Sequence, residues 1–217
     1  FDLLLVKYRL APDTDGLEDA PCEAAEALEQ WQFLLPVLEA HARAADNGRR
    51  GGMLLRLAKR YEEKLEDASH AFVLTAEALV SEPGSDDALS ELKRLAEATD
   101  TWEREAAALR AAAARCDDED RRITLYEGAA DIYWRKELGE QAAVMDRHIL
   151  SARPGHRDGL EALIAWHRER EEWDVLRDLL VKRIDILEEG ARLDAWLEVA
   201  RISEQQLQQP EQALLAY

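Results

Sequence analysis

Apolar residues recur along the chain at the three- and four-residue steps of one helix face. Two stretches that show this spacing are Trp31, Leu34, Leu35 and Leu38, and then Leu54, Leu57, Ala58, Tyr61 and Leu65. The same spacing continues over 68–82 and 86–98. The pattern therefore predicts four amphipathic helices between residues 31 and 101.

Some boundaries between these helices carry no turn residue. "ALEQW" before Trp31 and "REREEW" before Trp173 contain neither Gly nor Pro, so the breaks there follow from register alone. Pro36 falls inside the first expected helix. Because proline removes a backbone hydrogen bond in a helix interior, that helix is expected to start late or to kink.

The helical pattern repeats without gaps every 71 residues. The aligned sets are Trp31, Trp102 and Trp173; Leu38, Leu109 and Leu180; Arg50, Arg121 and Arg192; Ala58, Ala129 and Ala200; Ala71, Ala142 and Ala213; and Pro12, Pro83 and Pro154. A fixed period is typical of an array whose units bury each other's apolar faces. The sequence therefore predicts one array over 1–217, with units 31–101 and 102–172, a partial unit 173–217 and a partial preceding unit 1–30.

The three aligned tryptophans have two interpretations. A large ring opposite small residues such as Ala129 fills the groove where two helices cross, which predicts core positions for Trp31, Trp102 and Trp173. The alternative is a ladder of rings on which bases or sugars stack.

Composition agrees with an all-α protein and restricts its partners. Ala, Glu, Leu and Arg are abundant, and 46 acidic residues against 28 basic ones give a formal net charge of -18. Such a charge disfavours nucleic acid and anionic membranes, so a charged partner is expected to be basic. No apolar run reaches the roughly 18 residues that span a bilayer. Cys22 and Cys116 have no metal-site spacing and are expected to be buried thiols in a reducing compartment, which predicts a cytoplasmic protein.

Motifs for catalysis are not found in the sequence. The five histidines form no His-Glu-x-x-His arrangement, no Gly-x-Ser-x-Gly is present, and "NGRRGG" lacks the Lys-Ser/Thr ending of a phosphate loop. We therefore expect a non-catalytic protein without cofactor or metal.

Each 71-residue period holds two helix–turn–helix units of about 35 residues. "LLRLAKRYEEKLEDASHAFVLTAEALVSEPGS" and "LYEGAADIYWRKELGEQAAVMDRHILSARPGH" resemble the tetratricopeptide repeat. The residues that carry the resemblance are Ala58, Tyr61, Ala71, Ala78 and Pro83 in the first, and Ala129 or Ala130, Tyr133, Ala142 and Pro154 in the second. The resemblance implies a right-handed superhelical solenoid of antiparallel helix pairs, similar to long arrays of degenerate repeats in large bacterial proteins. A pentatricopeptide array that reads RNA also has this repeat length, but the acidity of the chain argues against it.

In that family the first helix of each unit lines a concave groove. By resemblance, the partner-binding candidates are Lys59, Glu62, Tyr126, Tyr133, Trp134, Arg201 and Gln205. The register around Tyr133 is open. Aligned without a gap, Tyr133 matches Glu62 and an aromatic pair faces the groove; shifted by one residue, Tyr133 matches Tyr61 in the core and Trp134 is the exposed residue.

The expected function is a protein-interaction scaffold that binds a peptide or protein in the concave groove. Two alternatives are an architectural spacer or subunit of a large assembly, and a docking or regulatory region of an enzyme encoded in flanking sequence. Phe1 and Tyr217 both fall inside expected helices, so a longer protein is expected. Leucines that would otherwise leave exposed apolar faces near the two ends are Leu3, Leu4, Leu5, Leu214 and Leu215.

Overall fold

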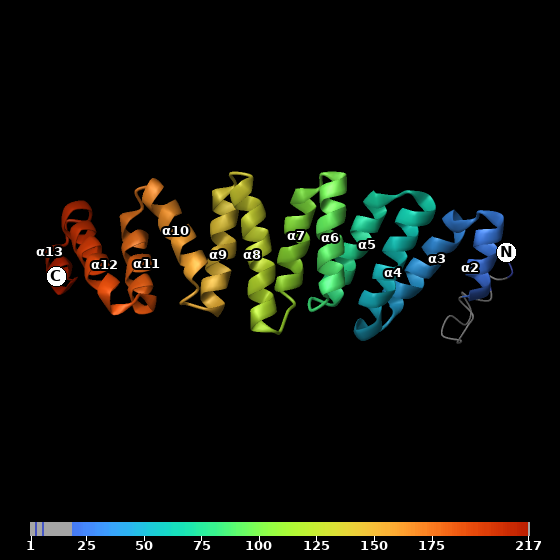
Figure 1. Cartoon of the computed structure of the whole chain (residues 1–217), viewed down its shortest axis with the longest axis horizontal. Helices are drawn as coiled ribbons and strands as arrows, with labels where there is room; N and C mark the ends of the chain where they lie inside the picture. Colours follow the sequence, from blue (N-terminus) through green and yellow to red (C-terminus); the bar gives the residue numbers. More distant parts are fainter. Residues whose placement is uncertain (1–2, 4–5, 7–18, 217) are drawn as a thin grey trace. The chain divides into compact units, whose positions relative to one another are not determined.

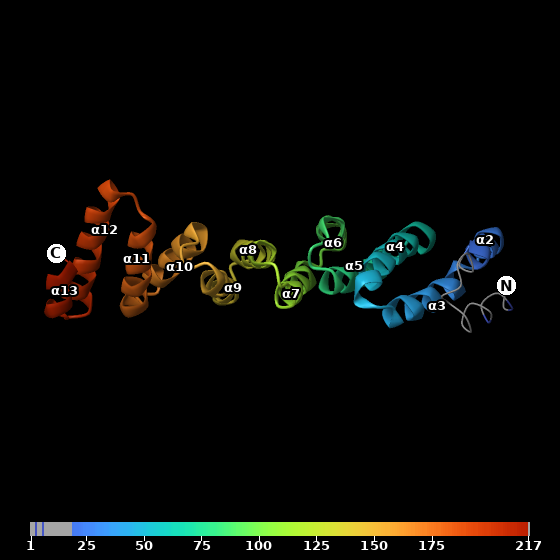
Figure 2. The same cartoon turned by 90° about the horizontal axis from the view of Figure 1, so that it is seen from below.

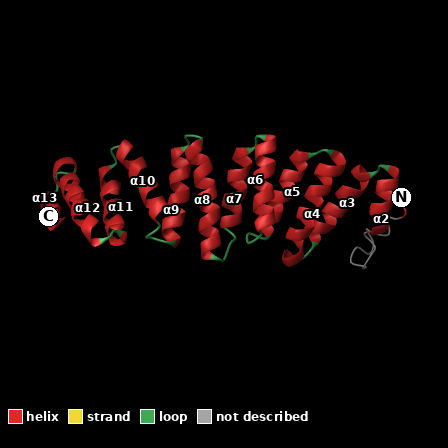
Figure 3. Ribbon diagram, in the orientation of Figure 1, coloured by secondary structure: helices red, strands yellow, loops and turns green. Residues whose placement is uncertain are grey.

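A computed structural model describes residues 3, 6 and 19–216 of the chain. Over these residues the elements are twelve α-helices and one π-helical turn, with no strand (Figure 1; Figure 3). The elements are α2 (Asp19–Leu28), α3 (Trp31–Ala44), α4 (Asn47–Leu65), α5 (Ala68–Ser81), α6 (Asp86–Thr99), α7 (Trp102–Ala113), α8 (Glu119–Arg135), α9 (Gly139–Ala152), α10 (Arg157–Glu169), α11 (Trp173–Ile186), α12 (Glu189–Arg201), the turn η1 (Ile202–Gln206) and α13 (Pro210–Ala216). The all-helical prediction is confirmed for this part of the chain.

The four helices predicted between residues 31 and 101 are α3 to α6. The third and fourth, α5 and α6, match the expected ranges closely. The second, α4, begins at Asn47, seven residues before the predicted start, so "NGRRGG" is helical. Gly51 lies in this extension, and a Cβ there would lie 2.9 Å from the Cβ of Glu82. The missing side chain lets the first turns of α4 pack closely against the end of α5.

Pro36 does not delay the start of α3. The helix begins at Trp31 and runs through Pro36, whose ring is exposed at the surface. The missing N–H leaves the carbonyl of Gln32 without its helical donor, at a residue that is itself exposed. Solvent on that side reduces the cost of the lost hydrogen bond.

The 71-residue period is also a property of the backbone. Positive φ angles occur in two sets, each spaced by 71 residues: Glu29, Asp100 and Glu171, and then Glu66, Glu137 and Gln208. In the first set the next residue donates its N–H back across the helix end, from Gln30 to Ala25 at 2.9 Å, from Thr101 to Ala96 at 3.0 Å and from Glu172 to His167 at 3.0 Å. These left-handed ends supply the breaks at "ALEQW" and "REREEW", where no Gly or Pro marks them.

Burial selects between the two registers at Tyr133. Tyr61, Ile132 and Ser203, spaced by 71 residues, are all buried. Tyr133, which the shifted alignment places in the core, is half-buried. Ile132 therefore takes the core position, and the alignment without a gap describes the side chains.

The last turn differs among these three copies. The N–H of Asp67 reaches the carbonyl of Tyr61 and that of Gln209 reaches Ser203, whereas Leu138 reaches Tyr133, one residue nearer. The turn closed by this hydrogen bond is therefore wider at the end of α4 and after η1 than at the end of α8.

The chain divides into two compact units, Phe1–Arg122 and Ile123–Tyr217. In the first unit α5 packs against α4, α6 and α7 (Figure 1; Figure 2). In the second, the buried core includes Leu160, Leu163, Leu176 and Leu180, contributed by α10 and α11. Each core is built mainly between helices that are neighbours in the chain.

The three aligned tryptophans each begin a helix and are all half-buried. Trp173 packs against the core of the second unit. The indole of Trp31 donates to Glu26 at 2.8 Å and lies 5.6 Å from the ammonium of Lys64. The rings thus sit at the edge of the packed interior rather than inside it.

Several sequence expectations concern the chain ends and cysteines. Leu3, Leu214 and Leu215 are exposed. The remaining terminal residues named above, Phe1, Leu4, Leu5, Pro12 and Tyr217, lie outside the described residues. Cys116 is buried as expected, with its thiol 3.5 Å from the carbonyl of Asp118, whereas Cys22 is half-buried.

Candidate functional site

A pocket of about 610 Å³ lies in the first unit between α3, α4, α5 and α7. Its volume falls within the roughly 300–1,000 Å³ of ordinary binding pockets. We call it the α3–α5–α7 pocket. The side chains that line it are mainly apolar, namely Leu54, Phe72, Val73, Ala76, Val80, Ala107 and Ala108, together with Ser81 and the charged residues Arg43, Arg50, Glu77 and Arg104.

Helical spacing on α5 and small residues on α7 produce this pocket. Phe72, Ala76 and Val80 follow one another at four-residue steps, so they form a ridge along one side of α5. On the opposite wall, Ala107 and Ala108 come from the alanine-rich run of α7. Because an alanine projects only one carbon, the space between α5 and α7 stays open.

Arg43, which lines the pocket, pairs with two carboxylates. Its Nε and Nη2 donate to the two carboxylate oxygens of Glu77 at 2.9 and 2.8 Å, and its Nη1 lies 2.6 Å from Glu39. The hydrogen bond to Glu77 is the largest cause of the raised pKa of Arg43. Glu77 therefore forms a two-point ion pair, in which both carboxylate oxygens accept from the planar guanidinium of Arg43.

A buried carboxylate outside the pocket lining, that of Glu39, continues this network. Glu39 accepts from the Tyr61 hydroxyl at 2.8 Å and contacts His70 Nε2 at 2.9 Å. Burial acts to raise the pKa of Glu39, but the hydrogen bonds with His70 and Tyr61 and the charge of Arg43 outweigh it, so the pKa is lowered. The ionised carboxylate anchors Arg43 from the α3 side.

The other two arginines of the pocket have no carboxylate partner among the described residues. Arg50 donates from Nε and Nη2 to the carbonyl of Ala45, at 3.2 and 2.9 Å. The guanidinium carbon of Arg104 lies 5.2 Å from the centre of the Phe72 ring, an arrangement typical of a cation–π contact. The lining thus holds three arginines and one acid, and that acid is already paired.

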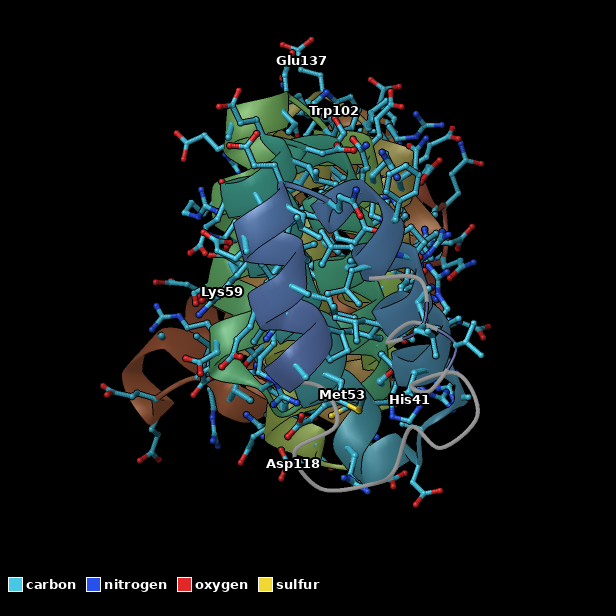
Figure 4. The ribbon with its side chains drawn as sticks, turned by 90° about the vertical axis from the view of Figure 1, so that its right-hand side faces the viewer. His41, Met53, Lys59, Trp102, Asp118 and Glu137 are labelled. Carbon is cyan, nitrogen blue, oxygen red and sulfur yellow. The ribbon has the colours of Figure 1, made fainter. Side chains whose placement is uncertain are left out.

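The predicted groove residues of the first unit lie outside the pocket. Lys59 is exposed and points outward (Figure 4). Glu62 forms an ion pair with Arg94, which also binds Glu91 at 2.7 Å. The hydrogen bond from Arg94 is the main cause of the lowered pKa of Glu91. Glu62, Arg94 and Glu91 thus form a charged network between α4 and α6.

Two of the predicted groove aromatics in the second unit are engaged by their own neighbours. Tyr126 is buried, and its ring stacks on His148 with centroids 4.9 Å apart. Trp134 is half-buried and donates from Nε1 to Asp146 at 2.9 Å, with its ring edge-on to Trp166 at 5.6 Å. Tyr126 therefore offers almost no surface to a partner, and the polar atom of Trp134 is already satisfied.

The last two predicted residues, Arg201 on α12 and Gln205 in η1, are exposed. None of the seven predicted residues lines the α3–α5–α7 pocket. Sequence reasoning missed Arg104 and Ala107, although "WEREAAALR" places an arginine next to a run of small residues. That juxtaposition is the sequence signal for the pocket.

No model of a known protein family matches the chain, and the search of curated proteins gives no significant match. Across residues 19–216, with residues 3 and 6, no helix has the length and apolar character needed to cross a membrane. The same residues contain no group of three or more His, Cys, Asp or Glu side chains placed to hold a metal ion.

Proposed function

We propose that the chain is a non-catalytic scaffold that binds a segment of another protein in the α3–α5–α7 pocket. The observation that carries this proposal is an apolar wall, whose accessible part is the half-buried Val73, Ala76 and Val80, beside the exposed Arg104 and Ala107. Exposed lining residues favour an occupant that lies along the helices, because enclosed small-molecule sites bury most of the ligand surface. The acid in the pocket, Glu77, is paired with Arg43 and is a poor candidate for a general base.

The finer architecture belongs to the same proposal. We infer a tetratricopeptide-like array of antiparallel helix pairs, wound as a right-handed solenoid and working in the cytoplasm. The 71-residue recurrence of left-handed helix ends at Glu29, Asp100 and Glu171 supports it, because equal local turns at equal spacing generate a regular stack. X-ray scattering in solution tests this architecture: a rod-like profile is expected, and a compact globule contradicts it.

Site-specific cross-linking tests the binding site. A photoreactive p-benzoylphenylalanine replaces Ala107 in the pocket lining, and a control protein carries it at the exposed Ala111 of the same helix, outside the lining. We expect a protein adduct from native extract at position 107 and none of the same mass at position 111. Equal adducts at both positions, or none at either, contradict binding in the pocket. That result favours an architectural role.

A further inference from the structure

Resting on that proposed function, we infer that the segment bound in the α3–α5–α7 pocket is both apolar and acidic. Its apolar side chains cover the half-buried Val73, Ala76 and Val80 of α5, and its carboxylate pairs with Arg104. This partner chemistry is opposite to the basic partner expected from the net charge of the chain.

The charge balance of the lining supports an acidic occupant. The whole chain carries 46 acidic and 28 basic residues, yet this pocket holds three arginines and one glutamate. Glu77 already forms a two-point ion pair with Arg43. Arg43 also pairs with Glu39 behind the lining, so the positive charge without a carboxylate partner among the described residues is that of Arg50 and Arg104. A carboxylate from a partner complements it.

The position of Arg104 shows how the carboxylate is received. Its guanidinium lies 5.2 Å from the Phe72 ring, and no hydrogen bond or ion pair of this side chain occurs within the described part of the chain. Stacking on an aromatic face leaves the in-plane N–H donors of a guanidinium available for a carboxylate. Because Phe72 itself is buried, the partner's carboxylate contacts Arg104, while a neighbouring apolar side chain of the partner contacts the half-buried apolar residues of the lining.

The net charge of -18 does not prevent this pairing. At physiological ionic strength, exposed charges are screened beyond about 8 Å, so distant acids act weakly on a carboxylate already at the rim. Contacts within the pocket decide which charge binds. Substitution of Arg104 therefore tests the pairing more directly than a salt titration does.

The test is a selection of random 12-residue peptides displayed on phage against the 217-residue chain. The wild-type protein is expected to enrich peptides that combine apolar residues with Asp or Glu. Arg104→Glu is expected to lose these peptides or to select Lys and Arg instead. The matched control is Arg110→Glu, an exposed arginine of the same helix that does not line the pocket, and it is expected to enrich the same acidic peptides as wild type.

The enriched peptide then gives a quantitative readout by fluorescence anisotropy. Because charge reversal removes an exposed ion pair and adds repulsion, we expect Arg104→Glu to weaken binding about five-fold or more. A peptide with Gln in place of its acid should bind wild type more weakly, while losing little further affinity for Arg104→Glu. That non-additivity identifies a direct pair.

The outcomes separate this inference from the proposed function. If the enriched peptides are neutral or basic, and Ala107→Trp, which fills the pocket, prevents their enrichment, the inference of an acidic partner is wrong but the proposed binding site stands. Enrichment that is unaffected by Ala107→Trp, or no enrichment, overturns both. Self-association of the chain that Arg104→Glu abolishes would make a second copy the occupant, which also overturns the inference.

Discussion

The absent side chain of Gly139 lets a tryptophan close over the start of α9. A Cβ at this position would lie 2.1 Å from the Trp166 ring, closer than any two non-bonded carbon atoms approach. Trp166 in turn contacts Trp134 edge-on and lies under Arg170, whose guanidinium carbon is 4.9 Å from the ring centre. One missing carbon thus allows a layered contact between α8, α9 and α10.

Gly139→Ala is therefore expected to lower the free energy of unfolding by about 1–3 kcal/mol, because the ring must shift in a packed region. The control is Gly190→Ala on α12, where a Cβ would have no heavy atom within 4 Å. That substitution should be neutral or stabilise by up to about 1 kcal/mol. Urea unfolding of both variants measures the difference, and similar effects in the two would contradict the packing argument.

Asp146 gives the second unit a pH-dependent stability. Burial raises the pKa of this carboxyl to about 6, although the hydrogen bond from Trp134 acts to lower it. Between the ordinary pKa of Asp near 4 and a pKa near 6, the folded chain holds a proton that the unfolded chain has lost. The contribution of Asp146 to stability therefore falls as pH rises through this window and stays low above it.

Asp146→Asn removes this titration while leaving an oxygen for the Trp134 N–H. Relative to wild type, the variant is expected to gain about 1–3 kcal/mol of unfolding free energy between pH 4 and pH 7. Urea denaturation at a series of pH values measures the gain. The exposed Asp185→Asn controls for the loss of one acid. A constant difference between Asp146→Asn and wild type over this range would show that Asp146 ionises normally.

At the scale of the helix, several helices end at a residue that has a positive φ but is not glycine. Glu66 closes α4 with φ of 53°, and Glu137, which extends from the surface at the end of α8, has φ of 59° (Figure 4). For a side chain with a Cβ the left-handed region costs roughly 1–2 kcal/mol, and glycine avoids this cost. Packing between successive helices must therefore hold these ends in place.

Glu66→Gly is expected to stabilise the protein by about 0.5–1 kcal/mol, since the relief of strain exceeds the added freedom of the unfolded chain. Glu63→Gly, three residues earlier on the exposed side of α4, loses the same charge from a helical position. It should cost about 0.5–1 kcal/mol. Thermal melts of the pair measure the opposite signs, and destabilisation by both changes would show that the end of α4 does not gain from glycine.

At the scale of the molecule, the contacts found within each unit are predominantly local in sequence. Helices pack against the next helix, as α4 does on α5 and α10 on α11, or against the next but one, as α5 does on α7. Stability of this kind is close to a sum of neighbouring interfaces. A defect should therefore spread only to adjacent helices.

Hydrogen exchange in the Gly139→Ala variant tests this locality. Faster exchange is expected in α9 and α10, while the amides of α3 to α5 keep their wild-type protection, because partial opening costs less than global unfolding. Mass spectrometry of peptic fragments resolves the two regions. Equal loss of protection in both would indicate one cooperative core and would contradict an additive array.

The pattern of the chain was sufficient for the presence of the helices between residues 31 and 101 and for their period, but not for the start of α4. Apolar spacing within a helix depends on residues near in the sequence, so α5 and α6 could be predicted nearly to their ends. The 71-residue period follows from aligning the sequence with itself. The sequence left two registers open around Tyr133, and only the burial of Ile132 favours the alignment without a gap.

The tertiary structure decided the features that depend on which helix faces meet. Gly51 lies so close to the end of α5 that a Cβ would not fit, and Trp134 is engaged because Asp146 faces it from α9. The pocket joins Arg43 on α3 to Arg104 on α7, residues 61 positions apart with no shared motif. Periodicity determines which face of a helix is apolar, but the space left between helices depends on the sizes of side chains brought together only by packing.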